Sequence, residues 1–177
     1  AEDGIRDSVA SRGLGDVYKR QSIIDITEKK QSDLSLQYLA THDSLTGVYN
    51  RRQFETDFRE KLSQKSDIPV CILFMDLDRF KVVNDTCGHK AGDVLIKDIA
   101  RLIENTLHDE ALLARLGGDE FGVIYTDVDA NDVYLNAVKI LNAVQAYRFM
   151  WDNRIFNLGV SIGMVVCEDT EVNADEG

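Results

Sequence analysis

The sequence predicts an α+β domain in which helices flank a central, mostly antiparallel sheet. Three observations point to this fold class. Residues Val70–Met75 form a nearly continuous apolar run of strand length. Two further apolar runs, Leu112–Leu116 and Phe121–Tyr125, are separated by a short glycine-containing turn, which is the pattern of a hairpin. Amphipathic helical patterns lie between these runs, so the order is helix, strand, helix, hairpin, helix, strand.

The first helix of this domain is predicted to begin after Asn50. Asparagine is a favoured N-cap because its side-chain oxygen accepts a hydrogen bond from a backbone N–H of the first turn. Phe54, Phe58 and Leu62 follow with helical spacing, so their side chains share one face. That face is expected to pack against the sheet.

The remaining elements follow from their apolar patterns. Val70–Met75 is predicted to be a central strand covered on both faces, because nearly all of its side chains are apolar. Helices are predicted over Lys90–Leu107 and Val133–Tyr147, where apolar residues recur with helical spacing. A last strand is predicted over Asn157–Val166.

The chain before Asp43 divides into two segments. Residues 1–21 carry glycine and serine breaks without sustained periodicity, and they resemble a translated sequencing-adaptor remnant. We interpret them as a non-native leader; a native flexible leader is the alternative. Residues 22–42 combine a β-like run, Ser22–Thr27, with a helical pattern, and resemble the junction between a PAS sensor domain and its output domain. We interpret them as the end of an upstream sensor domain and a connecting helix, with a plain surface helix as the alternative.

Composition excludes several classes of protein. The chain has 177 residues, a net charge of −11 and 44% hydrophobic residues, which fits a globular domain with at most an appendage. The acidic excess argues against nucleic acid as a partner and favours a divalent cation with any phosphate-bearing ligand. Three scattered cysteines indicate reduced thiols and a cytoplasmic location. Since no apolar stretch approaches the roughly 18 residues of a membrane span, we expect no membrane contact from this segment, although a longer parent protein could be anchored.

Two acidic clusters are the candidate functional groups. Asp76-Leu77-Asp78 closes the apolar strand, and Asp119-Glu120 lies in the hairpin turn beside Gly117-Gly118. Carboxylates that meet in this way repel each other unless a cation lies between them, and Mg²⁺ prefers such oxygen ligands together with substrate phosphates. The glycines let a backbone approach a ligand without obstruction by Cβ. The pattern indicates metal-assisted chemistry on a nucleotide; the alternative is an ordinary hairpin turn with solvated acids.

The segment Arg115–Phe121, with the sequence RLGGDEF, resembles the signature of the GGDEF family, the diguanylate cyclases. Further segments agree with that family in order and spacing: Asp43–Gly47 with Asn50–Arg52, Phe74–Lys81 with Asn84-Asp85, Gly88-His89 with Gly92-Asp93, and Ser161–Gly163. The resemblance covers about Asp43 to Val166. It implies a ferredoxin-like core of the cyclase-palm type and a catalytic domain over residues 43–177 that is truncated at its C-terminus.

The resemblance also implies a reaction, in which two GTP condense to cyclic di-GMP and release two pyrophosphates. It makes Asp76 and Asp119 ligands of Mg²⁺, or alternatively Mn²⁺, with the Leu77 carbonyl as a third ligand. Glu120 lies beside them for metal binding or turnover. Asp119 is the family's candidate to accept the 3′-hydroxyl proton, although a metal-bound carboxylate is a weak base.

Substrate-binding residues are implied in the same way. Asn84 and Asp93 match the positions that bind guanine, where an acidic acceptor and an amide favour G over A. Lys81 fits a phosphate contact, with a surface lysine as the alternative, and Gly117 and Gly118 complete the set.

The implied partners are GTP, an upstream sensor domain and a second copy of the chain. Because the product is two-fold symmetric, we expect an antiparallel homodimer to be the active form. Arg51 and Arg52 are expected to hold the N-terminal segment to the domain by ion pairs rather than contact a substrate.

Two departures from the family pattern qualify these implications. Many members carry an Arg-x-x-Asp product-inhibition site, whose positions are held here by His108 and Ala111, so we predict no feedback inhibition there. The chain stops at Gly177, before a helix that supplies a lysine and an arginine to the phosphates in the family and covers the sheet.

Two alternative functions remain. One is a catalytically inactive GTP-binding, dimerisation or signalling module of the same fold. The other is a metal-dependent phosphodiesterase or nuclease, against which the sequence offers no second cluster of His and Asp.

Overall fold

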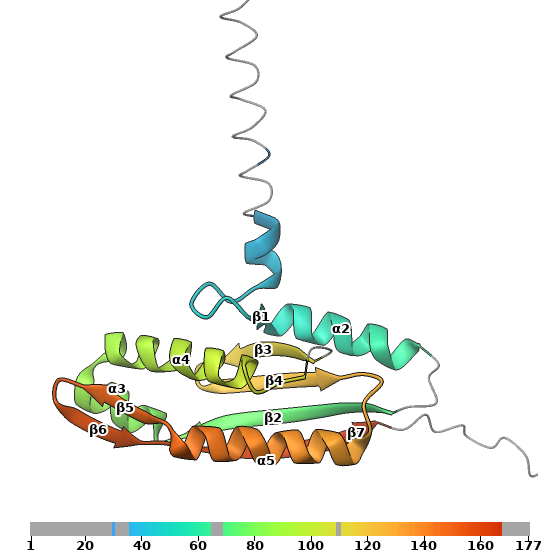
Figure 1. Ribbon diagram of the computed structural model, residues 1–177. Coiled ribbons are helices and arrows are strands. Elements are labelled where there is room, and N and C mark those ends of the chain that lie inside the picture. The colour runs from blue at the N-terminus through green and yellow to red at the C-terminus, as the bar shows by residue number, and fades with distance from the viewer. Residues whose placement is uncertain (1–29, 31–35, 65–68, 109–110, 168–177) are drawn as a thin grey trace, which may run out of the picture. The chain divides into compact units, whose positions relative to one another are not determined.

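The computed structural model describes residues 30, 36–64, 69–108 and 111–167 (Figure 1). The chain divides into two compact units, Ala1–Ala40 and Thr41–Gly177. In the first unit residues 36–40 are helical, while the predicted leader over residues 1–21 and the β-like run Ser22–Thr27 lie outside the described residues. Within the described ranges, no helix combines the length and the apolar character that a membrane span needs.

The second unit is built on a five-stranded sheet with the strand order β1-β3-β4-β2-β7. β1 pairs in parallel with β3, and all other neighbours are antiparallel, which confirms the mostly antiparallel sheet. The strands are β1 (Tyr49–Asn50), β2 (Val70–Asp78), β3 (Leu112–Gly117), β4 (Glu120–Tyr125) and β7 (Gly159–Cys167).

Helices pack on both faces of this sheet (Figure 1). On one face, Phe54 of α2 (Arg51–Ser63) lies in a buried cluster with Ile72 of β2. Successive strand residues point to opposite faces. The neighbour of Ile72, Leu73, therefore belongs to the other and larger cluster, with residues of α4 (His89–Glu104) and α5 (Ala130–Ala146). The short helix α3 (Phe80–Cys87) connects β2 to α4.

The start of α2 agrees with the predicted cap. The side chain of Asn50 accepts a hydrogen bond from the backbone N–H of Gln53 at 2.9 Å. Phe54 is buried and Phe58 is half-buried, whereas Leu62 near the end of the helix is 43% exposed. The apolar stripe therefore contacts the sheet with its first two members.

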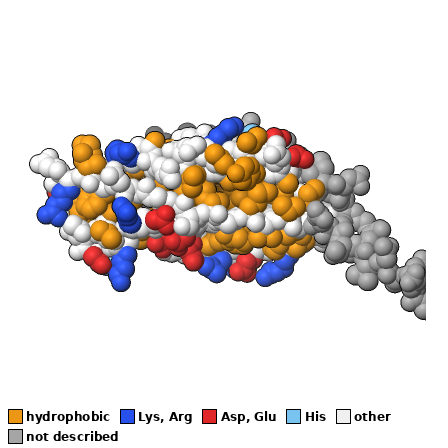
Figure 2. All heavy atoms as spheres, turned by 90° about the horizontal axis from the view of Figure 1, so that it is seen from below, with side chains coloured by type: hydrophobic (Ala, Val, Ile, Leu, Met, Phe, Trp, Pro, Cys, Tyr) orange, Lys and Arg blue, Asp and Glu red, His pale blue; other side chains and the backbone are white. Residues whose placement is uncertain are grey.

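The prediction that β2 is covered on both faces is wrong at one position. Phe74 is 44% exposed, and its cross-strand neighbour on β7, Gly163, is exposed as well. Phe54 of α2 approaches the Phe74 ring with a centroid distance of 6.1 Å but leaves its outer side open. Val165 of β7 lies on the same face and is 46% exposed. Figure 2 shows one side of the molecule, where hydrophobic side chains form a wide exposed area bordered by charged ones.

A second, two-stranded sheet was not predicted. It consists of β5 (Arg148–Trp151) and β6 (Arg154–Asn157), which form a hairpin after α5. Asp152 and Asn153 join the strands with φ values of 47° and 60°, as in a type I′ turn. The Asp-Asn pair between two aromatic-containing runs was the available signal.

Candidate functional site

The pairing of β2 with β4 brings the two acidic clusters side by side. Asp76 of β2 lies directly opposite Glu120, the first residue of β4. Opposed residues in an antiparallel pair have Cα atoms roughly 4.5–5.5 Å apart. In addition, the backbone N–H of Leu77 donates to the carbonyl of Asp119 at 3.3 Å. The strand end and the hairpin turn therefore form one site.

Carboxylates accumulate at this end of the sheet. The pKa of Asp76 is raised, first by desolvation and then by the negative charges of Asp119, Glu120 and Asp78. The side chain of Asp76 is nevertheless exposed, so a ligand can reach it from solvent. Repulsion among carboxylates is relieved when a divalent cation binds between them.

The oxygen donors at this point suit magnesium. Asp76 and Asp119 supply two carboxylates. In an antiparallel ladder, the N–H and the C=O of one residue face the same neighbouring strand. The carbonyl of Leu77 therefore points to the side on which its N–H meets the Asp119 carbonyl. Two carboxylates with one carbonyl form a hard oxygen set that Mg²⁺ accepts when substrate and water complete its shell.

The other two acids already have partners. Asp78 accepts a hydrogen bond from the Ser161 hydroxyl at 2.9 Å, and Glu120 pairs with Arg51 at 3.3 Å. Across the described residues, no group of three or more His, Cys, Asp or Glu side chains is arranged to hold a metal. The ligand role expected for Glu120 thus remains a prediction.

Arg51 contacts the hairpin turn at two points. Its Nε donates to the backbone carbonyl of Leu116 at 2.6 Å, and its Nη2 donates to Oε2 of Glu120 at 3.3 Å. We expected an ion pair with the N-terminal segment, whereas the observed pair is with the turn. Sequence reasoning missed this role because partners 65 and 69 residues away leave no local signal.

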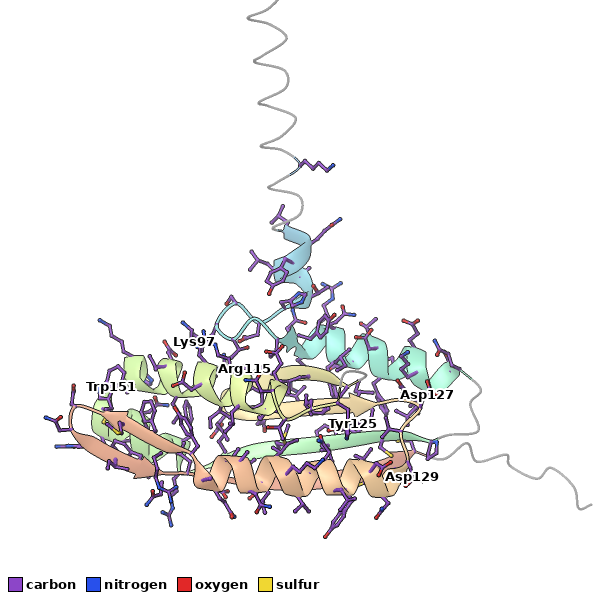
Figure 3. All side chains as sticks on the ribbon, viewed as in Figure 1. Lys97, Arg115, Tyr125, Asp127, Asp129 and Trp151 are labelled. Atoms are coloured by element: carbon purple, nitrogen blue, oxygen red, sulfur yellow. The ribbon has the colours of Figure 1, made fainter. Side chains whose placement is uncertain are left out.

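Arg115 contacts the same turn from β3 (Figure 3). Its Nε and Nη2 donate to the carbonyl of Gly118 at 3.1 and 2.8 Å, and its Nη1 donates to Asp43 at 3.1 Å. Partial burial favours a raised pKa for Asp43, but hydrogen bonds from Thr46 and Arg115 outweigh it and hold the pKa below the ordinary value. Arg115 therefore links the turn to the first loop of the second unit.

The two glycines of the turn differ in their surroundings. A Cβ placed on Gly117 would lie 3.4 Å from Glu120 Oε2, in ordinary contact. Gly118 has a φ of +22° and open space around the position of a Cβ. A ligand can therefore approach the backbone at Gly118 closely, as expected for a substrate-binding turn.

The predicted guanine-binding residues Asn84 and Asp93 lie on α3 and α4. Arg79, with a φ of 67°, turns the chain sharply from β2 into α3, whose first turn carries the exposed Lys81. Asn84 packs its side chain directly against the backbone of Gly92 in α4, so a larger residue than glycine would collide with it there. Asp93 follows Gly92 and is exposed. The structure thus brings Asn84 next to the α4 turn that carries Asp93.

A pocket of about 320 Å³ opens beside the acids. Its lining comes from α2, β2, the hairpin and β7: Arg51, Phe74, Met75, Asp76, Leu116, Glu120, Phe121 and Ser161. A separate pocket of about 420 Å³ includes His108 and Ala111, the two positions at which we predict the inhibitory site to be absent. That absence remains a prediction.

Comparison with known proteins identifies the domain. The profile described as "Diguanylate cyclase, GGDEF domain" matches residues 40–176. The chain is 39% identical over 156 residues to the probable diguanylate cyclase DgcE of Escherichia coli K12. It is 38% identical over 152 residues to the cyclic di-GMP phosphodiesterase PdeB of Shewanella oneidensis. These alignments cover 87% and 86% of this chain but only 14% and 18% of the two relatives.

Comparison with solved structures gives the same result as the comparison of sequences. The GGDEF domain of PA1120 from Pseudomonas aeruginosa matches with a TM-score of 0.65 and 36% identity, over 70% of this chain and 73% of that one. The coiled coil and GGDEF domain of DgcB from Caulobacter crescentus matches with a TM-score of 0.75 over 84% of this chain and 81% of that one. Its identity of 24% carries the fold alone, which confirms the predicted α+β class. Because the family profile extends over most of the chain, the protein belongs to the GGDEF domain family of diguanylate cyclases.

Proposed function

We propose that this domain is a diguanylate cyclase that condenses two GTP into cyclic di-GMP. The observation that carries the proposal is the register of β2 and β4, which aligns Asp76 with Glu120 and ties Leu77 to Asp119. An acidic site of this composition suits a nucleotide triphosphate bound with a divalent cation.

Each residue of the site has its own role in this proposal. Asp76, Asp119 and the Leu77 carbonyl would hold Mg²⁺, which when bound offsets the charge on the reacting phosphate. Asp119, in the turn, is our candidate to accept the proton of the attacking 3′-hydroxyl. Lys81, exposed at the start of α3, is our candidate to contact phosphate oxygens. The backbone of Gly118 offers an unobstructed surface for the substrate.

Base selection is assigned to the α3–α4 pair. The side chain of Asn84 is fixed in position by its packing against Gly92. Asp93 is exposed and can accept hydrogen bonds from the N1–H and N2–H₂ edge of guanine, which adenine lacks. Donor and acceptor matching of this kind rejects the wrong base more strongly than shape does.

Each half-reaction joins the 3′-oxygen of one nucleotide to the α-phosphorus of the other, so two sites must face each other. An antiparallel homodimer supplies that arrangement with one GTP per protomer. We propose that a sensor region upstream controls this dimer, because the chain spans less than a fifth of the length of the two relatives described above.

A catalytically inactive GTP-binding module is the second candidate. It is favoured by one observation: a relative 38% identical to this chain is named a cyclic di-GMP phosphodiesterase, so the matching region also occurs in proteins with the opposite activity.

Incubation of the chain with GTP and Mg²⁺, followed by chromatography of the products, distinguishes the two candidates. A cyclase gives cyclic di-GMP with a rate that rises with the square of protein concentration at low concentration, and Asp119→Ala abolishes it. If the unmodified chain and Asp119→Ala both bind GTP and neither forms product, the inactive module is the correct candidate.

A further inference from the structure

The backbone ladder between β3 and β4 fixes the turn that carries Asp119 only in part. The pairing of β3 with β4 shifts register between Arg115 and Gly117, so Leu116 has no partner in the ladder. A shift of this kind leaves backbone groups unpaired and bends the strand. Gly117 and Gly118 follow without side chains to restrain the backbone. Arg115 of β3 holds the Gly118 carbonyl and Leu77 of β2 holds the Asp119 carbonyl, so the position left to fill is one outside the hairpin from which the Leu116 carbonyl and the Glu120 carboxylate can be held.

Arg51 occupies that position. It begins α2, a helix anchored by the buried Phe54, so its backbone is part of a rigid element. Its guanidinium donates hydrogen bonds to the carbonyl of Leu116 on β3 and to the carboxylate of Glu120 on β4. These two partners stand on either side of Gly117, Gly118 and Asp119, and one side chain thus closes the turn across both strands.

The energetics of this contact point to position rather than to stability. The side chains of Arg51 and Glu120 are 58% and 53% exposed. Ion pairs so open to water contribute little to folding because solvent screens them and ordering two long side chains costs entropy. The same contacts nevertheless set where the turn lies, and catalysis is far more sensitive than folding to displacements of about 1 Å.

We propose that Arg51 is a positioning residue for the reaction. It holds the turn from Leu116 to Glu120 at a fixed place relative to Asp76, and it keeps the Glu120 carboxylate turned toward α2. The planar guanidinium can serve two acceptors at once, which the single ammonium of lysine cannot do in the same geometry. This inference rests on the proposed cyclase function for its effect on rate.

The test compares Arg51→Ala and Arg51→Lys with Arg52→Ala, the adjacent arginine of the same helix turn. Arg52 is exposed, and in the described part of the chain its side chain makes none of the hydrogen bonds or ion pairs found for Arg51. We expect Arg51→Ala to lower kcat by about 10- to 100-fold. The KM for GTP should stay within about threefold, because Arg51 acts through Glu120 and the turn rather than on the substrate. Arg51→Lys should recover only part of the rate, and Arg52→Ala should behave as the unmodified chain.

Hydrogen–deuterium exchange of the peptide that spans the turn provides a readout without substrate or metal. Faster exchange in Arg51→Ala, with no change in Arg52→Ala or in the peptides of α4 and α5, is the expected result. In a chain that already carries Glu120→Gln, adding Arg51→Ala should lower kcat by a smaller factor, because one of the two partners of Arg51 is already gone.

The two proposals fail separately. If the unmodified chain makes no cyclic di-GMP but its turn exchanges faster after Arg51→Ala, the cyclase proposal falls and the bracing of the turn stands. If the chain is active and Arg51→Ala matches Arg52→Ala in kcat or in exchange, the positioning role of Arg51 is overturned. A variant Arg51→Ala that fails to fold would also contradict it, since an ion pair so exposed contributes little to stability. Arg51→Lys would then show whether any rate effect is separate from folding.

Discussion

The two ends of the hairpin β3–β4 are held by different kinds of contact. At the turn end, the groups that fix the chain are charged: the exposed Arg51–Glu120 pair and the more buried Arg115–Asp43 pair. At the open end, the hydroxyl of Tyr125 is fully buried and donates to the side-chain oxygen of Asn136 on α5. The amide of Asn136 donates in turn to the carbonyl of Thr106 at 2.8 Å, after the end of α4. Figure 3 shows Tyr125 and Arg115 at these separate ends.

This difference separates stability from chemistry within one pair of strands. The buried end fixes the register, because a slip of one residue would turn every apolar side chain of β4 to the wrong face. That register aligns Cys71 with Tyr125 and, further along, Asp76 with Glu120. The exposed end can then keep carboxylates in water, ready for a cation, since it is not required to hold the fold together.

The largest expected effect is at the exposed end, where Asp76→Asn should reduce cyclase turnover at least ~100-fold. The substitution removes a carboxylate that we assign to Mg²⁺ while keeping size and shape. The midpoint of thermal unfolding in the absence of metal should stay the same or rise, because a charge repelled by Asp119 and Glu120 is gone.

Turnover and thermal unfolding of Asp76→Asn should be measured beside Asp132→Asn, an exposed aspartate of α5. Turnover should be unchanged in that control. A strongly lowered unfolding midpoint in Asp76→Asn would contradict the separation, because the acidic end would then support the fold.

The buried end should respond in the opposite way. Asn136→Ala leaves the Tyr125 hydroxyl and the Thr106 carbonyl without their partner, and unsatisfied buried groups cost about 1–3 kcal/mol each. Urea unfolding should show a destabilisation of about 2–6 kcal/mol for the two groups together, while turnover of the folded fraction is retained. Asn142→Ala on the exposed side of the same helix should be neutral. Equal effects of the two substitutions would show that the buried network does not stabilise this end.

The sequence supported much of this comparison and missed a specific part of it. The apolar runs predicted β2, β3 and β4, because a buried strand consists of apolar residues that are adjacent in the sequence. The close approach of Asp76 to the turn was also predicted, from the two acidic clusters and the family resemblance. The partner of Arg51 did not follow, because it depends on how α2 crosses the sheet, and nothing near Arg51 in sequence specifies that crossing.

Two elements were missed for local reasons. No helix was predicted between the strand that ends at Asp78 and the helix predicted from Lys90, yet α3 occupies this stretch. Its eight residues are too short for a clear helical period in the sequence. The β5–β6 hairpin was missed because its four-residue strands are too short for a clear alternation.

The middle of the hairpin sharpens the comparison, because two glycines flank Phe74 on the neighbouring strands. A Cβ on Gly122 of β4 would lie 2.7 Å from the Phe54 ring, whereas one on Gly163 of β7 would meet nothing within 4 Å. Gly122→Ala should therefore destabilise the fold by about 1–3 kcal/mol through overpacking. Gly163→Ala should change the free energy of unfolding by less than about 0.5 kcal/mol. Chemical denaturation of both variants measures the difference in the free energy of unfolding. Similar losses in the two variants would show that packing at Gly122 is no tighter than at Gly163.

The smallest expected effect concerns the pH dependence of the link between Asp43 and Arg115. Both side chains are more buried than the Arg51–Glu120 pair, at 24% and 16% exposure, so their contribution is near the upper end for such pairs, about 1 kcal/mol. The pKa of Asp43 is lowered in the folded protein: burial opposes this, but the hydrogen bonds from Thr46 and Arg115 prevail. A lowered folded pKa gives stability that is fully present above the unfolded value, about 3.9, and is lost as the pH falls through the folded value.

Asp43→Asn should therefore be less stable than the unmodified chain at pH 7 by about 1 kcal/mol, and the difference should be smaller at an acid pH below the unfolded value of about 3.9. Denaturant unfolding at the two pH values measures it, with Asp57→Asn on α2 as a control for general charge effects. A loss of several kcal/mol at pH 7 would mean that the turn end is held as firmly as the Tyr125 end, because Asp43 is linked to the turn through Arg115 and the Gly118 carbonyl. The exposed end would then be a structural element in its own right, and the division between a stabilising and a reactive end of this hairpin would no longer hold.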